Sequence, residues 1–158
     1  MREISSFIPI KAYSIINQWL EKSKLKIIIS NPRKSKLGDY RSPFKGKNHI
    51  ISINNNLNKY AFLITLTHEI AHMMTWEKHK KYVKPHGKEW KEMYRKLMLR
   101  LIPIFPIDIQ QCLAIHLKNP KASTTSDLRL YTVLRKYDKK KYLTVANVKN
   151  GTFFETPN

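Results

Sequence analysis

The sequence His68-Glu69-Ile70-Ala71-His72 lies inside an uninterrupted helical segment, and this restricts what the chain can fold into more than any other feature. No proline or glycine occurs from Lys59 to Val83, and Asn58 is a suitable N-cap. Two histidines four residues apart lie on one side of a helix, so both imidazoles can reach one metal ion. Glu69 then lies beside the metal and can hold a water against it. Neutral imidazoles suit zinc, and such a carboxylate is the general base of a metallopeptidase.

The rest of this helix has two predicted faces. Its buried side consists of apolar residues at helical spacing: Phe62, Leu63, Leu66, Ile70 and Met73. A narrower, more polar stripe is expected to face a cleft, and it comprises Thr65, His68, His72 and Thr75. The alternative is a pair of surface histidines on a core helix. The helical context favours the metal site.

A catalytic zinc site usually has three protein ligands and a water, so two histidines leave it one ligand short. Metzincins place a glycine three residues and a third histidine six residues after the second histidine. In this chain these positions are Thr75 and Lys78, so the metzincin pattern is excluded. The remaining candidates lie further along the chain: His79, His86, Glu89 and Glu92.

Among these candidates His86 is expected to be the third ligand. His79 lies on the same face as His72 if the helix continues, but it is too far along the axis to share a metal. His86 stands between Pro85 and Gly87, where the chain turns into a second predicted helix with the apolar side Trp90, Met93, Tyr94, Leu97 and Leu101. A ligand at the start of a returning helix can reach back to the first helix. Glu89 is the main alternative; if it is not a ligand, we expect it to orient a histidine through the second ring nitrogen.

The two-part pattern, His68-Glu69-Ile70-Ala71-His72 followed by His86-Gly87-Lys88-Glu89-Trp90, resembles the SprT-like (Spartan-type) zinc metalloprotease domain. The segment before the motif also resembles this family: it contains Gly38-Asp39-Tyr40-Arg41 and then a short strand at residues 50–53 that leads into the helix. The resemblance covers about residues 10 to 118. It implies a zincin-like endopeptidase with Zn²⁺ as cofactor, His68, His72 and His86 as ligands and Glu69 as catalytic base. In characterised relatives the substrates are proteins trapped on DNA, and this too is implied only by the resemblance.

The remaining pattern predicts an α+β fold. An N-terminal helix is expected over residues 10–22, and strands over residues 25–30, 37–42 and 49–54. We expect these strands to form a small, mainly antiparallel sheet packed on the two metal-binding helices. An exposed sheet edge beside the cleft would pair with extended substrate, and either the Tyr40 strand or the Ile50 strand could supply it.

The chain is expected to divide into a metallopeptidase domain, residues 1–118, and a basic C-terminal extension, residues 119–158. The domain would end with a helix over residues 107–118. The extension is predicted to contain a helix that starts at Ser126-Asp127 and a β-hairpin around Asn150-Gly151, a strong type I′ turn signal.

The net charge of +19 arises from 30 Lys and Arg against 11 Asp and Glu. A positive net charge of this size attracts polyanions, so we expect the protein to bind DNA non-specifically and more weakly as the salt concentration rises. The alternative is a surface whose lysines only keep the protein in solution. Many of the basic residues flank the ligand-bearing segments: Arg33, Lys34, Lys36, Arg41, Lys45, Lys47, Lys78, Lys80, Lys81, Lys84, Lys88 and Lys91.

The single cysteine, Cys112, cannot form an internal disulfide and is expected at a core or half-buried position. The presence of a single cysteine fits a reducing, cytoplasmic compartment, and it excludes a zinc ribbon, which needs several cysteine ligands. The sequence has no apolar run long enough for a membrane helix, and residues 1–22 lack the pattern of a secretory signal. His116 is expected to have a structural role near the end of its helix, and His49 is expected to be a strand-start residue, with a contact to the substrate as the alternative.

These observations predict hydrolysis of peptide bonds in protein substrates. Tyr40, Arg41 and Tyr82 are candidate donors to the carbonyl oxygen. The main alternative is a basic nucleic-acid-binding protein that keeps the zinc for structure. Glu69 argues against it, because a structural site needs neither a base nor an open position. A further alternative is a peptidase whose charge serves solubility alone.

Overall fold

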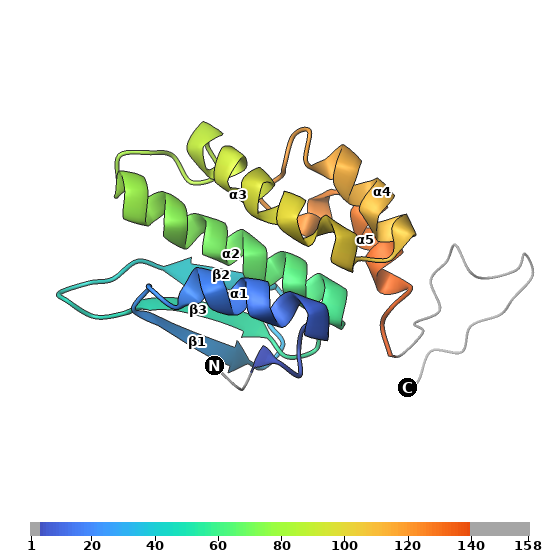
Figure 1. Cartoon of the computed structure of the whole chain (residues 1–158), viewed down its shortest axis with the longest axis horizontal. Helices are drawn as coiled ribbons and strands as arrows, with labels where there is room; N and C mark the ends of the chain where they lie inside the picture. Colours follow the sequence, from blue (N-terminus) through green and yellow to red (C-terminus); the bar gives the residue numbers. More distant parts are fainter. Residues whose placement is uncertain (1–3, 140–158) are drawn as a thin grey trace, which may run out of the picture.

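The computed structural model describes residues 4–139 and has an α+β architecture, with a small three-stranded sheet and five α-helices among these residues (Figure 1). The elements in chain order are α1 (Tyr13–Leu20), β1 (Leu25–Ser30), β2 (Gly38–Arg41), β3 (His49–Asn54), α2 (Lys59–His79), α3 (Lys88–Leu101), α4 (Ile107–His116) and α5 (Leu128–Arg135). The predicted hairpin around Asn150-Gly151 lies outside the described residues.

The sheet has the strand order β1-β3-β2 and is mixed. β3 pairs in parallel with β1, from Leu25 opposite His49 to Ser30 opposite Asn54. β2 pairs antiparallel with the other side of β3, with Tyr40 opposite Ile51. The expectation of a mainly antiparallel sheet was therefore wrong. The chain reverses direction after β1 and again after β2, and β3 then inserts between them, so it runs in the direction of β1.

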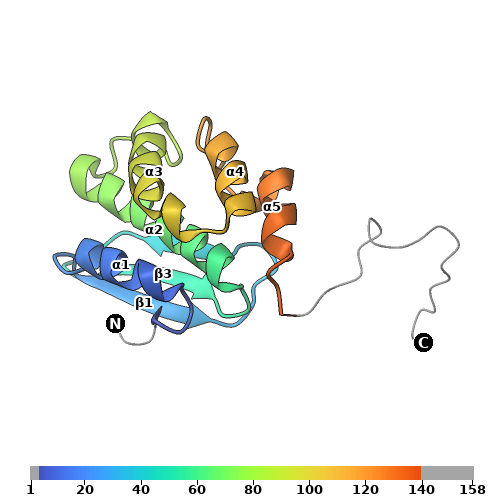
Figure 2. The same cartoon turned by 45° about the vertical axis from the view of Figure 1, so that its right-hand side comes forward.

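The helices form two layers above the sheet. α1 and α2 lie on one face of the sheet, and α3 and α4 lie on the far side of α2 (Figures 1 and 2). α2 is therefore enclosed from both sides, and every residue from Phe62 to Ala71 is buried. The predicted apolar side is confirmed, since Phe62, Leu63, Leu66, Ile70 and Met73 are all fully buried. A helix that is packed on both sides cannot shift easily, so α2 holds the side chains that project from it in fixed positions.

Asn58 caps α2, as predicted. Its side-chain oxygen accepts hydrogen bonds from the backbone N–H groups of Tyr60 (3.1 Å) and Ala61 (3.0 Å). Its side-chain nitrogen donates to the carbonyl of Leu134 at the end of α5 (2.9 Å). The same residue thus satisfies two free donors of the first turn and ties α5 to the start of α2.

The expectations for the N-terminal helix, His116 and Cys112 agree with the structure, apart from the start of that helix. Residues 10–12 form a 3₁₀ turn before α1, and Ile10 is 76% exposed, although Ile16 and Trp19 are buried as expected. His116 is buried, with Nδ1 2.8 Å from Asp127 Oδ2, which confirms a structural role. Cys112 is partly buried. No described helix is both long and apolar enough to cross a membrane.

Candidate metal centre

Three imidazole rings converge at one point between α2 and the start of α3. His68 and His72 project from neighbouring turns of α2, and His86 comes from the turn before α3. The Nε2 atoms of His68 and His86 are 3.0 Å apart, those of His72 and His86 2.9 Å, and those of His68 and His72 3.2 Å. In a tetrahedral zinc site with Zn–N distances of about 2.0–2.1 Å, ligand nitrogens are about 3.3 Å apart. The triangle therefore has nearly the size that one zinc ion requires.

The chemistry of this donor set also fits a cation. A neutral imidazole nitrogen carries either one proton or one lone pair, so three such atoms cannot hydrogen-bond to one another around a triangle. Burial, together with the neighbouring imidazoles, lowers the pKa of His68 to about 2 and that of His72 to about 3. Burial also lowers the pKa of His86. The rings are therefore held neutral, which is the form that binds a metal.

A tight turn places His86. Its backbone φ of 57° lies in the left-handed region, which is costly for a residue with a side chain. The following N–H, from Gly87, donates to the carbonyl of Lys84 (3.0 Å). A Cβ atom on Gly87 would lie 2.9 Å from that oxygen, so only glycine fits there without movement. The strained turn directs the imidazole of His86 back toward α2.

Trp90 supports all three rings. Its ring centroid lies 4.6 Å from that of His68, 4.7 Å from that of His86 and 5.3 Å from that of His72. Its indole N–H donates to the carbonyl of His68 (3.4 Å). Sequence reasoning placed Trp90 on the apolar side of a helix and in the two-part motif, but it did not predict this contact with the rings, which depends on how the turn at His86 folds back onto α2.

Glu69 is buried beside the histidines and lines the same cleft. Burial, reinforced by the nearby carboxylate of Asp39, raises the pKa of Glu69 to about 8. Asp39 is itself held by an ion pair with Arg33 and by a hydrogen bond from the Ser52 hydroxyl (2.5 Å). Gly38 of β2 faces Glu69 directly, and a Cβ atom there would be 3.0 Å from Glu69 Oε1. Sequence reasoning named Gly38 only as part of the segment before the motif and did not predict its contact with Glu69, because the contact joins two segments far apart in the chain.

The other candidate ligands do not join the cluster. Among residues 4–139, His68, His72 and His86 form the one group of three or more histidine, cysteine or acidic side chains whose ligand atoms come close enough to share a metal. His79 lies at the end of α2, and Glu92 is exposed on α3. Glu89 is partly buried in the first turn of α3, but within the described part of the chain it makes no hydrogen bond to the three rings, so its expected orienting role is not seen there.

A cleft of about 530 Å³ opens over the three histidines. Gly38, Asp39 and Tyr40 of β2 line one wall, and the α2–α3 connection, with Lys80, Lys81 and Lys84, lines the other. β3 is central in the sheet, so of the Tyr40 and Ile50 strands only the Tyr40 strand, β2, lies at an edge of the sheet, and it is also the strand that lines the cleft.

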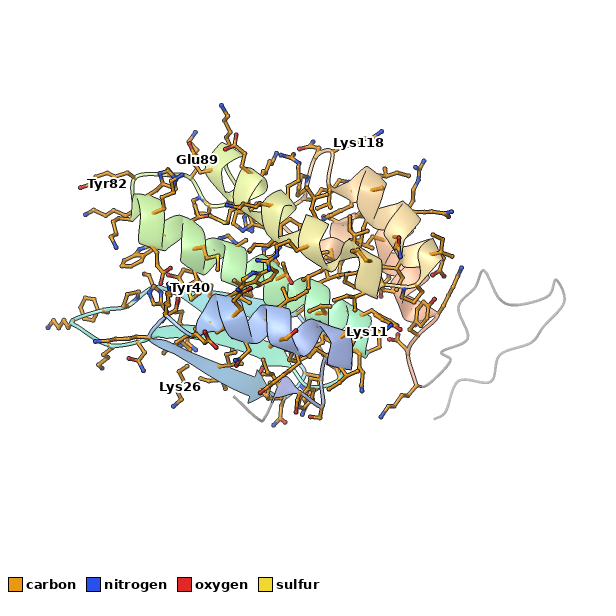
Figure 3. All side chains as sticks on the ribbon, in the orientation of Figure 1. Lys11, Lys26, Tyr40, Tyr82, Glu89 and Lys118 are labelled. Carbon is orange, nitrogen blue, oxygen red and sulfur yellow. The ribbon has the colours of Figure 1, made fainter. Side chains whose placement is uncertain are left out.

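The three candidate oxyanion donors are placed differently in the structure. Figure 3 shows Tyr40 between the sheet and α2, whereas Tyr82 projects outward from the α2–α3 connection. Tyr82 is 84% exposed, and the Arg41 side chain is 62% exposed and directed to Asp39 (3.4 Å). Of these three, Tyr40 alone lines the cleft. Burial, with a contribution from the nearby Glu77, raises the pKa of Tyr40, so its hydroxyl keeps its proton.

Comparisons with known protein families agree with this geometry. The SprT-like family model matches residues 11–111, which is more than half of the chain and includes the whole histidine cluster. Comparison with the curated proteins gave no match, and comparison with the solved structures gave none either. The chain therefore belongs to the SprT-like family.

Proposed function

We propose that this protein is a zinc-dependent, zincin-like endopeptidase. One observation carries the proposal: a buried carboxylate, Glu69, lies beside a triangle of three neutral imidazoles that opens into a cleft. His68, His72 and His86 would hold the ion. A bound zinc ion supplies the polarisation of the scissile carbonyl and lowers the pKa of a water to about 7. A closed structural zinc site would need four protein ligands and no base.

In this proposal Glu69 is the general base and then the general acid of the reaction. A carboxylate in a buried site has a raised pKa, which makes it a stronger base than an exposed glutamate and lets it retain a proton for transfer. Glu69 takes the proton from the attacking water and later passes it to the leaving amine. The short distance between Gly38 and the carboxylate fixes the position of Glu69 against the cleft wall.

The edge of β2 that faces away from β3, and that pairs with no other strand among residues 4–139, is the proposed binding site for the peptide backbone. β2 pairs with β3 on one side, and Gly38, Asp39 and Tyr40 line the cleft. An extended peptide can add to such an edge through main-chain hydrogen bonds. This mode suits an endopeptidase, because it requires a locally unfolded segment and places no demand on a chain terminus.

The proposed substrates are proteins bound or crosslinked to DNA. The net charge of +19 supports this, and so does the position of Lys80, Lys81 and Lys84 on the cleft wall. Lysines at that position would keep a phosphate backbone next to the metal centre, so a DNA-bound protein would be presented to the cleft. The alternative is a nucleic-acid-binding protein with a structural zinc site; the same charge favours it, but it leaves Glu69 and the open cleft without a role.

The first experiment separates the enzyme from the binding protein. Zinc-loaded protein and its Glu69→Gln variant are incubated with a DNA-crosslinked protein, with and without a chelator. We expect chelator-sensitive cleavage by the wild type, no turnover by the variant, and about one zinc per chain in both. Full cleavage by Glu69→Gln would contradict the role of Glu69. Salt-sensitive DNA binding with no cleavage by the zinc-loaded wild type would support the binding protein.

The role of DNA has its own test. Lys80, Lys81 and Lys84 are changed together to Gln, and the matched control changes Lys11, Lys26 and Lys118, which lie on other surfaces (Figure 3). For duplex DNA, the salt slope of binding should fall by about 0.9 for each phosphate contact that is lost. The cleft triple variant should lose stimulation of casein digestion by DNA, and the control should retain it. Equal behaviour of the two variants would remove the case for DNA beside the cleft.

A further inference from the structure

Hydrolysis of a peptide bond places negative charge on the carbonyl oxygen, and a protein donor aimed at that oxygen is usually worth a large part of the rate. The metal centre described above offers no such donor from the protein, because Glu69 is the proposed base and the three imidazole nitrogens would be occupied in holding the ion. A protein donor to that oxygen would then come from the walls of the cleft. Tyr40 is the residue whose position fits this requirement.

Tyr40 lies beside the metal centre on the substrate side. Its ring is parallel to that of His72, with an interplanar angle of 1° and centroids 6.3 Å apart. Tyr40 is on the same face of β2 as Gly38, because side chains two residues apart point the same way from a strand. Gly38 faces Glu69, so the phenol lies along the same wall as the catalytic carboxylate. A peptide paired with β2 would run directly past it.

His49 fixes the phenolic oxygen. The Tyr40 hydroxyl is 2.9 Å from His49 Nδ1, across the β2–β3 pair. His49 is buried, and the edge of its ring packs against Trp76. Its other nitrogen, Nε2, lies 3.6 Å from Glu77 Oε1, and Ser23 donates to the same carboxylate oxygen (3.1 Å). A carboxylate beside Nε2 favours a proton there, so Nδ1 is the acceptor and the Tyr40 hydroxyl is the donor.

Other hydroxyl groups near the cleft do not meet the requirement. Tyr82 is directed into solvent. Thr75 lines the cleft wall, but its Oγ1 is enclosed and cannot reach a substrate without movement. A phenol turns its O–H by rotation about one bond, and an oxygen that gains negative charge is a much stronger acceptor than a neutral imidazole. The hydroxyl is therefore held by His49 before substrate binds and is available to the substrate afterwards.

We propose that Tyr40 is a catalytic residue that donates a hydrogen bond from its hydroxyl to the carbonyl oxygen of the scissile peptide bond, and that His49 is the positioning residue that holds this hydroxyl at the cleft wall. This inference rests on the proposed endopeptidase function. It adds no bond-breaking step, because the phenolic proton stays on Tyr40 and only its hydrogen-bond acceptor changes.

The main test compares Tyr40→Phe with Tyr82→Phe, which removes the same hydroxyl from an exposed tyrosine. Loss of one oxyanion donor lowers kcat by about 10²–10³-fold. We expect this loss for Tyr40→Phe, with KM within about threefold of the wild type and with unchanged zinc content and unfolding temperature. Tyr82→Phe should match the wild type. If Tyr40→Phe keeps more than about a third of the wild-type kcat, the inference is overturned.

The role of His49 is tested by a double-mutant cycle. His49→Phe should lower kcat about fivefold, the worth of one positioning hydrogen bond. If His49 acts through Tyr40, the double variant Tyr40→Phe/His49→Phe should be no slower than Tyr40→Phe alone. Two independent losses that multiply would show that His49 does not act through Tyr40.

Two measurements do not depend on turnover. In metal-free protein, ¹⁵N NMR of the His49 ring should show Nδ1 as an unprotonated acceptor whose shift changes in Tyr40→Phe; an unchanged shift would contradict the hydrogen bond. A phosphonamidate peptide that mimics the tetrahedral state should bind zinc-loaded Tyr40→Phe about 10²-fold more weakly than wild type, and equal binding would contradict the donor role. A wild type without zinc-dependent cleavage would instead overturn the proposed function, so the two failures are distinct.

Discussion

Gly38 and Glu69 are in direct contact across the space between β2 and α2. A Cβ atom on Gly38 would lie 3.0 Å from Glu69 Oε1, 3.2 Å from Glu69 Cγ and 2.8 Å from Thr65 Cγ2. The backbone of the edge strand therefore passes too close to the proposed catalytic base for a side chain to fit at position 38 without movement. This contact lies in the wall of the cleft, beside the strand that is the proposed binding site for the substrate backbone.

Gly38→Ala should reduce activity without removing the metal. The added methyl group has no free space, and Thr65 is a β-branched residue in a helix that cannot turn aside easily. Overpacking of this kind costs about 1–3 kcal/mol, and the most mobile neighbour, the Glu69 carboxylate, should move. We expect kcat to fall at least tenfold while zinc content stays near one per chain. Wild-type kcat in Gly38→Ala would show that the position of Glu69 does not depend on this contact.

His86→Ala should weaken zinc binding more than any change at the other downstream candidates. Removal of one of three convergent nitrogens leaves a two-ligand site, so the affinity for zinc, measured by competition with a chelating dye, should fall at least 100-fold. The rise in unfolding temperature on adding zinc should be lost as well, because it reports binding to the folded state. The matched control is His79→Ala at the end of α2, which should keep both properties. A similar loss in the control would remove His86 as the third ligand.

The sequence was sufficient for the parts of the site that follow from local rules. The spacing of His68 and His72, the cap at Asn58 and the apolar side of α2 each depend on residues within a few positions of one another. His86 could be proposed because Pro85 and Gly87 mark a turn and a second helix follows. The strand at residues 49–54 was predicted with the observed bounds, since its β-branched residues and flanking turns define it.

Relationships across the sheet could not be predicted in the same way. The position of β3 between β1 and β2 depends on the order in which strands pair, and the sequence of each strand is compatible with several orders. The contacts of Gly38 with Glu69, and of Tyr40 with His49, follow from that order and from the packing of α2 on the sheet. The strained φ of His86 depends on the Lys84–Gly87 turn, whose geometry is set by the returning helix.

Tyr94→Phe should leave the protein as stable or make it more stable. Tyr94 is fully buried and stacks on Trp90 with ring centroids 5.0 Å apart, and within residues 4–139 its hydroxyl has no hydrogen-bond partner. An enclosed, unpaired hydroxyl costs about 1–3 kcal/mol, so its removal should raise the free energy of unfolding by about 1 kcal/mol. Urea unfolding of the two proteins under the same zinc conditions measures the difference. Destabilisation by more than about 1 kcal/mol would mean that the hydroxyl has a partner.

Asp127→Asn should change how stability depends on pH. Asp127 Oδ2 is 2.8 Å from His116 Nδ1, and its Oδ1 accepts from the N–H of Leu130, so this residue joins the end of α4 to the start of α5. Burial opposes ionisation of the carboxyl group, but the hydrogen bonds from His116 and Leu130, with the charge of Lys121, outweigh it and lower the pKa of Asp127. A carboxyl group with a depressed pKa in the folded state stabilises the fold above its unfolded value, about 3.9, and loses this contribution as pH falls through the folded pKa.

The comparison between wild type and Asp127→Asn isolates this contribution, because asparagine can still cap α5 and every other acidic group is common to both proteins. At pH 7 the variant should be less stable by about 1–2 kcal/mol, since it loses a charge-assisted hydrogen bond. The difference should shrink steadily below about pH 4, as the wild-type carboxylate takes up its proton. Urea unfolding from pH 2.5 to pH 7 with chelator present tests this, and Glu92→Gln, an exposed carboxyl group on α3, is the control. Parallel curves for wild type and Asp127→Asn across pH 4 would show that the Asp127–His116 contact does not favour the ionised carboxyl group.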